Sequence, residues 1–305
     1  MTTVDPSASL EAHRRVLGDS HPDTLTNLSN LANLLTRFLR RYDEAEPLLH
    51  ELVTTRKRVL GSEHPHTLTA MEHQAVLLRR MRRYDEAEGM WRELLDTRSR
   101  VLGEDHPDIV FSLMGLAKVL AVSSQLEEAE QLYRRAVDIG DRVLGEDNLE
   151  YPILLSNLAR LLNSQQRYDE ALPLCRRVTD AHRRLRGDNH HHTLGSINDI
   201  ATALYGLGRL DEAESLLRDV VARDRDYLGD EHPTTLNALA NLALTVAAQG
   251  DAEEAERFFR EALDGARKTH GERHPMTANL RRDLASLLRQ LGRDDEAAVI
   301  EALLD

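Results

Sequence analysis

Residues 61–103 read GSEHPHTLTAMEHQAVLLRRMRRYDEAEGMWRELLDTRSRVLG, and this stretch decides the fold because the chain repeats it. Its opening glycine recurs once after 43 residues and then five times after 42 residues. The column consists of Gly18, Gly61, Gly103, Gly145, Gly187, Gly229 and Gly271. A second marker, Tyr42-Asp43-Glu44-Ala45-Glu46, recurs in variants every 42 residues, so the single extra residue lies between Gly18 and Tyr42. Such a period indicates a protein built from stacked supersecondary units.

Each unit is predicted to contain two helices joined by a polar turn. Pro65 suits a first helical position because a proline there lacks only an N–H that would be unsatisfied anyway. Apolar residues follow at spacings of three and four, which is the pattern of an amphipathic helix. Asp85 and Glu86 place negative charge at the start of the second helix, where the helix dipole favours it. Gly103 then ends that helix, as glycine commonly does.

Two columns are alanine in all seven units, and a third is bulky. Small residues repeated at one point of each helix let two backbones approach closely, whereas the bulky side chains fill the space between units. The first-helix column is Ala32, Ala75, Ala117, Ala159, Ala201, Ala243 and Ala285, and the second-helix column is Ala45, Ala87, Ala129, Ala171, Ala213, Ala255 and Ala297. The bulky column is Leu49, Trp91, Tyr133, Cys175, Leu217 and Phe259. We therefore expect Trp91 and Cys175 to be core residues, and Cys175 to be an inert buried thiol.

Composition excludes several classes of protein. The chain has 305 residues and a net charge of −13, which disfavours binding to nucleic acid because phosphate contacts need a surplus of basic side chains. One cysteine cannot form a disulfide framework. No apolar run is long enough to span a membrane, and the first residues are not a signal peptide, so we expect a cytoplasmic protein without membrane contact. Arginine supplies 36 of the 39 basic residues, a bias that fits a high-GC bacterial gene.

The period is shared by several repeat classes. WD40 units have a similar length but need strands and turn glycines that this sequence lacks, whereas HEAT and armadillo units are all-helical competitors. The Tyr-Asp-Glu-Ala-Glu entry to the second helix and the Leu31-Ala32 pair of the first resemble the tetratricopeptide repeat instead. The 42-residue period and the Gly-acidic-acidic-His-Pro linker are similar to the kinesin light chain type of that repeat, which in bacteria often accompanies nucleotide-binding regulatory domains.

This resemblance covers about residues 7–305 and implies an all-α, right-handed superhelical solenoid of about seven 42-residue helix-turn-helix repeats. We expect residues 1–6 to be a disordered tail and residues 7–305 to form one solenoid domain. Residues 7–17 are only a second helix, and the last helix is truncated. Its apolar stripe, formed by Val299, Ile300, Leu303 and Leu304, suggests self-association through a terminal helix or a longer parent chain.

Two linkers depart from the pattern. Repeat four has Asn148-Leu149-Glu150-Tyr151-Pro152 in place of His-Pro, so its first helix should start late and change the local curvature of the solenoid. Repeat five has three adjacent histidines, His190 to His192, but adjacent side chains rarely converge on one ion. His190 is also the ordinary linker histidine of its repeat. We therefore read the linker histidines as turn residues and expect no zinc.

Catalytic motifs are missing from the sequence. It has no G-x-x-x-x-G-K-[ST] loop, and Gly206-x-Gly208 follows no strand, so neither nucleotide motif is present. His50-Glu51 lacks the second histidine of a zinc protease helix. The many Asp-Glu pairs are helix starts. We expect no catalytic residue, cofactor or metal, although a motif-free enzyme built on this scaffold stays an alternative.

The resemblance places ligand contacts on the first helices, which line the concave side of such solenoids. These inner positions lie six, three and two residues before the first-helix alanine and one, four and five after it. The column two before the alanine is rich in asparagine, which can donate to and accept from an extended peptide backbone, and departs at His73 and Gly115. The predicted peptide-binding residues are Asn30, Asn33, His73, Arg79, Arg80, Phe111, Met114, Lys118, Ile153, Asn157, Arg160, Asn198 and Asn241.

Charge at the inner positions differs in sign from the whole chain. Seven basic and three acidic residues give a net charge of +4, beside the apolar Phe111, Met114 and Ile153. One interpretation is that these arginines are ordinary solvent-exposed surface residues with no binding role. The other is a site for an acidic protein segment with one apolar anchor, which is what the resemblance implies. The function is thus predicted as a protein-interaction scaffold, with the sensor arm of a larger nucleotide-binding regulator as the alternative.

Overall fold

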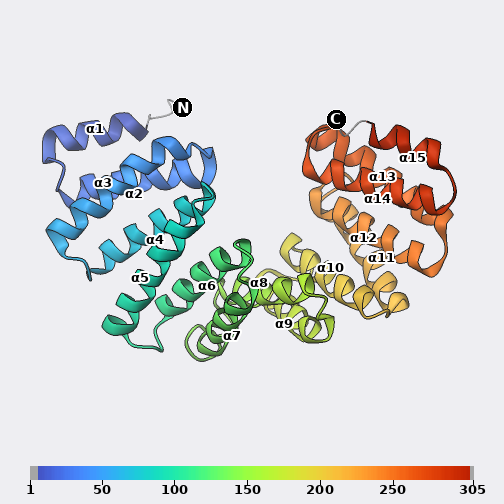
Figure 1. Cartoon of the computed structure of the whole chain (residues 1–305), viewed down its shortest axis with the longest axis horizontal. Helices are drawn as coiled ribbons and strands as arrows, with labels where there is room; N and C mark the ends of the chain where they lie inside the picture. Colours follow the sequence, from blue (N-terminus) through green and yellow to red (C-terminus); the bar gives the residue numbers. More distant parts are fainter. Residues whose placement is uncertain (1–5, 303–305) are drawn as a thin grey trace. The chain divides into compact units, whose positions relative to one another are not determined.

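The computed structural model describes residues 6–302, and over that range the chain folds into fifteen α-helices and no strand (Figure 1). The all-α helix-pair architecture predicted from the period is therefore confirmed. The helices are α1 (Pro6–Leu17), α2 (Pro22–Leu34), α3 (Tyr42–Leu60), α4 (Pro65–Arg80), α5 (Tyr84–Leu102), α6 (Pro107–Val122), α7 (Leu126–Val143), α8 (Tyr151–Ser164), α9 (Tyr168–Arg186), α10 (His191–Gly206), α11 (Leu210–Tyr227), α12 (Pro233–Gln249), α13 (Ala252–His270), α14 (Pro275–Gln290) and α15 (Asp294–Glu301).

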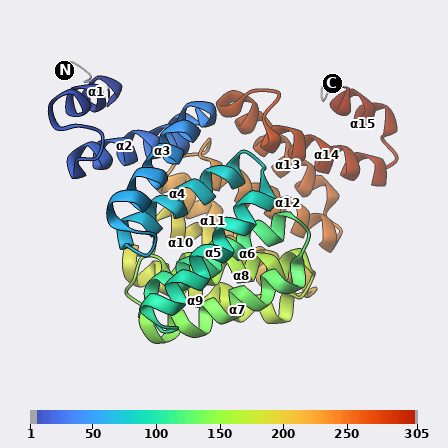
Figure 2. The same ribbon diagram turned by 60° about the vertical axis from the view of Figure 1, so that its left-hand side comes forward.

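The chain divides into two compact units, Met1–Gly145 with α1 to α7 and Glu146–Asp305 with α8 to α15. Within each unit, consecutive helices lie side by side, so first and second helices alternate along the stack (Figures 1 and 2). The helix α1 begins at Pro6, and residues 1–5 lie outside the described part, so the tail over residues 1–6 stays a prediction. One solenoid over residues 7–305 stays a prediction.

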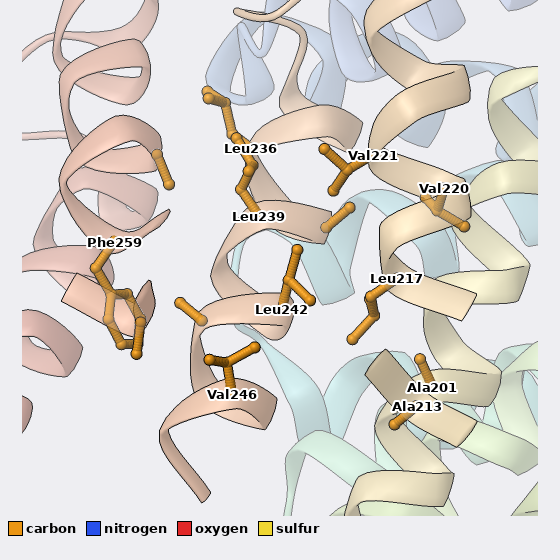
Figure 3. Packing of buried hydrophobic residues seen from close by; sticks show 14 of the residues in the cluster. Ala201, Ala213, Leu217, Val220, Val221, Leu236, Leu239, Leu242, Val246 and Phe259 are labelled. Atoms are coloured by element: carbon orange, nitrogen blue, oxygen red, sulfur yellow. The ribbon is translucent and has the colours of Figure 1, made fainter. Parts of the chain in front are cut away.

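The alanine columns lie inside the helix pairs. All fourteen alanines are at most 3% exposed, and each member of the bulky column is equally buried. Figure 3 shows this packing in the second unit, where Leu217 on α11 and Phe259 on α13 flank Leu242 on α12. Burial raises the pKa of the Cys175 thiol to about 12, which confirms an inert buried cysteine.

The linker histidines cap the first helices. In six repeats the histidine Nδ1 accepts the backbone N–H of the residue two positions later, at 3.1 or 3.2 Å. The ring nitrogen thereby satisfies one of the backbone N–H groups that have no partner within the helix. The capping histidines are His21, His64, His106, His190, His232 and His274. Their predicted structural role is confirmed.

Repeat four keeps the cap but loses the usual helix start. Asn148 occupies the register of the linker histidine, and its Oδ1 accepts the Glu150 N–H at 2.8 Å. The helix α8 then begins at Tyr151, two residues later than the linker proline would start it. The predicted late start is confirmed.

The extra residue of repeat one appears as a π-helical turn over Leu35–Leu39, at the end of α2. A π turn is how a helix absorbs one inserted residue, since each bond then spans five residues instead of four. The turn leaves Phe38 76% exposed. The insertion thus lies between Gly18 and Tyr42, as the spacing predicts.

Of the apolar stripe predicted on the last helix, Val299 is exposed and Ile300 packs against the core of the second unit. Leu303 and Leu304 lie outside the described residues. No helix within residues 6–302 is long and apolar enough to cross a bilayer.

Candidate functional site

The predicted binding residues fall into two sets, one on each unit. Asn30 and Asn33 lie on α2, His73, Arg79 and Arg80 on α4, and Phe111, Met114 and Lys118 on α6. In the second unit, Ile153, Asn157 and Arg160 lie on α8, Asn198 on α10 and Asn241 on α12. Most are exposed or half-buried, but Met114 is 4% and Asn157 5% exposed. Those two side chains therefore lie beneath the surface, and Phe111 and Ile153 are the accessible apolar groups.

Polar side chains at the inner positions link neighbouring repeats. The Asn33 amide nitrogen lies 3.1 Å from His73 Nδ1, and the Asn241 amide donates to Asn198 Oδ1 at 3.1 Å and to Thr202 Oγ1 at 3.4 Å. Burial, as the largest cause, lowers the pKa of His73 and so favours the neutral ring, whose Nδ1 can accept this hydrogen bond. His73 thus replaces asparagine without losing the contact between repeats. Some of the asparagine amides predicted to bind a ligand therefore form hydrogen bonds between neighbouring repeats instead.

Gly115 replaces the usual asparagine of this column for a different reason. A Cβ at this position would lie less than 3.0 Å from the indole of Trp91, a distance that real Cβ atoms essentially never show. Trp91 extends from α5 to the backbone of α6, so only glycine fits beneath it. The asparagine column is therefore interrupted in repeat three by core packing.

A pocket of about 410 Å³ lies beside two of the predicted asparagines, between α1 and α2. Asn27, Asn30 and Asn33 line one side, and Phe38 from the π turn lines another. Asn27 is held by His13 Nδ1 at 2.9 Å, whereas Asn30 is exposed. The sequence analysis did not include Asn27 or Phe38. The extra residue between Gly18 and Tyr42 was the signal that could have indicated Phe38.

Three arginines at the inner positions of the first unit have no carboxylate partner within residues 6–302. They are Arg37 at the π turn and Arg79 and Arg80 at the end of α4. Burial lowers the pKa of Arg79, and the adjacent Arg80 lowers it further. The two positive charges therefore repel one another at a partly buried position. The one acidic inner residue of this unit, Glu72, is bound at 2.8 Å by the buried Arg98.

Arginines on the second helices are in the opposite situation, because they form ion pairs from one repeat to the next. Arg92 lies 2.8 Å from Glu128, and Arg218 lies 2.7 Å from Glu254. Further pairs of this kind are Arg14–Glu51, Arg100–Glu63, Arg142–Asp105 and Arg225–Glu261. Arg83 and Arg293, which directly precede α5 and α15, pair in the same way with Glu46 and Glu256. Within residues 6–302, most arginines on the second helices of the first unit have a carboxylate partner, with Arg15, Arg56 and Arg58 as exceptions, whereas Arg37, Arg79 and Arg80 at the inner positions have none.

The inner positions of the second unit are closer to neutral. Arg160 donates to Asn157 Oδ1 at 2.7 Å and lies near Asp199 on α10. Burial raises the pKa of Asp199 to about 6, although Arg160 acts in the opposite direction. The Asn157 amide nitrogen is buried without a hydrogen-bond partner. The other two basic inner residues of this unit, Arg282 and Arg289, donate to Asn279 and Glu301, so the unit has no cluster of cations without partners among its described inner positions.

The histidine cluster is a stacking arrangement. The rings of His190 and His191 are 4.2 Å apart, as are those of His191 and His192, while His190 also caps α10. Within residues 6–302, no group of three His, Cys, Asp or Glu side chains is arranged to hold a metal ion.

Comparisons with known proteins agree on the fold. The tetratricopeptide repeat family matches residues 27–90, 69–142, 150–226, 194–268 and 234–300. A putative kinesin light chain from Podosopora anserina with nearly identical TPR-like repeats is 24% identical, with a TM-score of 0.60 over 68% of this chain and 98% of that one. No curated protein matches the chain significantly.

Two further solved structures are similar over most of the chain. The apo form of the quorum sensor NprR from B. thuringiensis has a TM-score of 0.73 at 16% identity, over 98% of this chain and 82% of that one. A Rap protein complexed with Competence and Sporulation Factor has a TM-score of 0.63 at 14% identity, over 91% and 75%. At these identities the likeness concerns the fold alone.

Proposed function

Because the chain belongs to the tetratricopeptide repeat family, we propose that it is a non-catalytic scaffold that binds an acidic protein segment along the first helices of its first unit. The observation that carries this proposal is the unpaired charge of Arg37, Arg79 and Arg80. Surface arginines without partners are common, but most arginines on the second helices of the same unit pair with a carboxylate, as Arg92 and Arg100 do with residues of neighbouring repeats. The contrast favours a binding role over that of ordinary surface residues.

The chemistry suits a carboxylate-bearing segment. A guanidinium group makes strong bidentate pairs with carboxylates, and the mutual repulsion of Arg79 and Arg80 would be relieved by an anion between them. Phe111 and Phe38 supply accessible apolar surface for an anchoring side chain. The exposed Asn30 amide can donate to and accept from a peptide backbone.

The similar folds support a ligand-binding role without identifying the ligand. One of the similar structures is a quorum sensor, and the other is a complex with a factor. The proposal concerns an acidic segment of a protein partner, and the surrounding net charge of −13 would repel long polyanions while the local field attracts a short one.

The test is a panel of short fluorescein-labelled peptides, acidic, neutral or basic, each with one leucine and one tryptophan. We expect the acidic peptide to bind the first-helix surface better than the neutral or basic peptide does, and its affinity to fall as salt rises because the charges are screened over about 8 Å at physiological ionic strength. Arg79→Gln with Arg80→Gln should weaken its binding about tenfold, equivalent to about 1.4 kcal/mol.

The matched control is Arg58→Gln with Arg257→Gln, which removes the same charge from exposed positions of two second helices. If the control weakens acidic-peptide binding as much as the Arg79 and Arg80 variant, net charge and not this site determines affinity. Stronger binding of the basic peptide to the first-helix surface would also overturn the proposal.

A further inference from the structure

Each unit contains a pocket on the other side of its first helices, between two successive second helices. In the first unit, a pocket of about 650 Å³ lies between α3 and α5 above α4. In the second unit, a pocket of about 510 Å³ lies between α9 and α11 above α10. The two pockets use the same positions of the repeat, since Leu78 and Leu204 form the floor and Met90 and Leu216 line the wall. We call them the second-helix pockets.

A small residue opens each pocket. Gly89 and Ser215 occupy the same position, two residues after the second-helix alanine, and both line their pockets. Other repeats place Gln131, Arg257 and Val299 there. A Cβ added to Gly89 would meet nothing within 4 Å, so close packing does not require this glycine. Glycine inside a helix costs about 1 kcal/mol relative to alanine, which suggests that the open space itself is useful.

The lining combines an apolar floor with a surplus of negative charge. In the first unit the carboxylates of Glu46, Glu86 and Glu93 surround a single cation, Arg83. In the second unit Asp211 and Glu212 accompany Arg176. A smaller pocket of about 290 Å³ shares Arg176 and Leu216 and extends this groove along α9 and α11 with an equal number of further acidic and basic groups.

We propose that the second-helix pockets bind arginine or lysine side chains of a basic protein segment. The aliphatic stem would pack on Leu78 and Met90, or on Leu204 and Leu216, and the cationic head would reach the carboxylates above them. These carboxylates form exposed ion pairs, such as Arg83 with Glu86 at 2.6 Å and Lys57 with Glu93 at 3.2 Å. Exposed pairs contribute little stability, so an incoming cation can exchange with them at small cost.

Charge complementarity determines the choice of partner. Both pocket linings contain more carboxylates than cations, although Glu212 in the second also pairs with Arg209 at 2.6 Å. The whole chain has a charge of −13, which attracts basic segments over the range of the Debye length. The proposed acidic ligand of the first helices would occupy a different face, lined by Arg79 and Arg80. The second-helix pockets therefore add a second binding surface of opposite preference.

The test measures binding of a short fluorescein-labelled peptide of alternating arginine and leucine to the full chain. Binding of this peptide is compared with that of two further peptides in which glutamate or glutamine replaces arginine. Gly89→Gln and Ser215→Gln fill the pockets with a side chain that repeat three already carries at this position. We expect two binding equivalents for the arginine peptide, one after either substitution and none after both.

The controls separate the pockets from other effects. Gly195→Gln changes a helical glycine that also has open space around it but lines neither pocket, and it should leave arginine-peptide binding unchanged. The double pocket variant should bind the acidic peptide like the parent, so the two proposals fail independently. Unchanged arginine-peptide binding in the double variant, or preference of the pockets for the glutamate peptide, would overturn the inference. Circular dichroism should show both variants folded, because glutamine favours the helix over glycine.

Discussion

The indole of Trp91 occupies the space that a side chain at Gly115 would need. The two residues lie on consecutive helices, α5 and α6, and belong to columns that carry other residues elsewhere. Leucine replaces the tryptophan in repeats one and five, and asparagine replaces the glycine in repeats one, four and six. The pair shows that one large core residue excludes a side chain from the asparagine-rich column of the neighbouring helix.

This relationship predicts a coupled pair of substitutions. Gly115→Ala should lower the free energy of unfolding by about 1–3 kcal/mol, because the new Cβ overpacks the indole. The same substitution in a Trp91→Leu background should be neutral or stabilising. Chemical denaturation of the four proteins of the cycle measures the coupling. Gly195→Ala is the control, since open space surrounds it and alanine should stabilise by up to about 1 kcal/mol. Equal effects of Gly115→Ala in both backgrounds would contradict the prediction.

The repeated turn position that follows the first helices offers sites for stabilising substitutions. A turn residue one or two positions after each first helix has a left-handed backbone, with φ of 62° at Ser124 and 60° at Gln166, and glycine occupies this position in later repeats as Gly208, Gly250 and Gly292. A non-glycine residue in this conformation costs about 1 kcal/mol. Ser124→Gly and Gln166→Gly should each raise the free energy of unfolding by up to about that amount in urea titrations. Gly208→Ala should have the opposite effect, and a stabilising Gly208→Ala would refute the strain argument.

Replacing the buried Asp224 should stabilise the fold by an amount that depends on pH. This carboxyl on α11 is 0% exposed, both oxygens lack partners, and burial raises its pKa to about 6. The folded chain therefore binds a proton more tightly than the unfolded chain, and stability falls as pH rises from about 4 to about 6. Asp224→Asn should stabilise by about 2 kcal/mol at pH 7 and have little effect at pH 4. Thermal melts at both pH values test this, and a gain of the same size at pH 4 would exclude the titration as its cause.

His182 predicts the opposite pH dependence. Its ring on α9 is 8% exposed, and burial, followed by His192 and Arg186, lowers its pKa to about 4. The stabilisation from keeping this ring neutral is complete above about pH 6.5 and is lost as pH falls toward 4, because the unfolded chain takes up the proton first. An NMR titration of the ring protons should give a midpoint near 4 in the folded chain. A midpoint near 6.5 would show that the ring is not buried as described.

Much of the fold follows from the repeat period. The spacing of Gly18 to Gly271 predicts the helix pairs, the proline at 152 predicts the late start of α8, and the mismatch before Tyr42 locates the π turn. The alanine columns predict which face of each helix is buried. These features depend on backbone conformation and helix periodicity, which are local and are therefore recorded in the order of residues.

The candidate sites could be predicted only in outline. The sequence indicates which positions face inward, but not that the Met114 and Asn157 side chains lie beneath the surface, or that Asn33 contacts His73. Nor does it show that Arg79 and Arg80 lack carboxylate partners in the described part of the chain, while Arg92 has one. Each of these facts depends on side chains from another helix, often about forty positions away in the chain.

By itself, then, the sequence determined the helix pairs, their caps and their buried faces, because a repeated local pattern specifies a repeated backbone. Only the tertiary structure decided which of the repeated positions are available to a partner. Trp91 removes a side chain at position 115, Gly89 opens a pocket, and Glu72 is neutralised by Arg98. The physical reason is that availability depends on the volume and charge of the neighbouring repeat, which vary from unit to unit while the period stays constant.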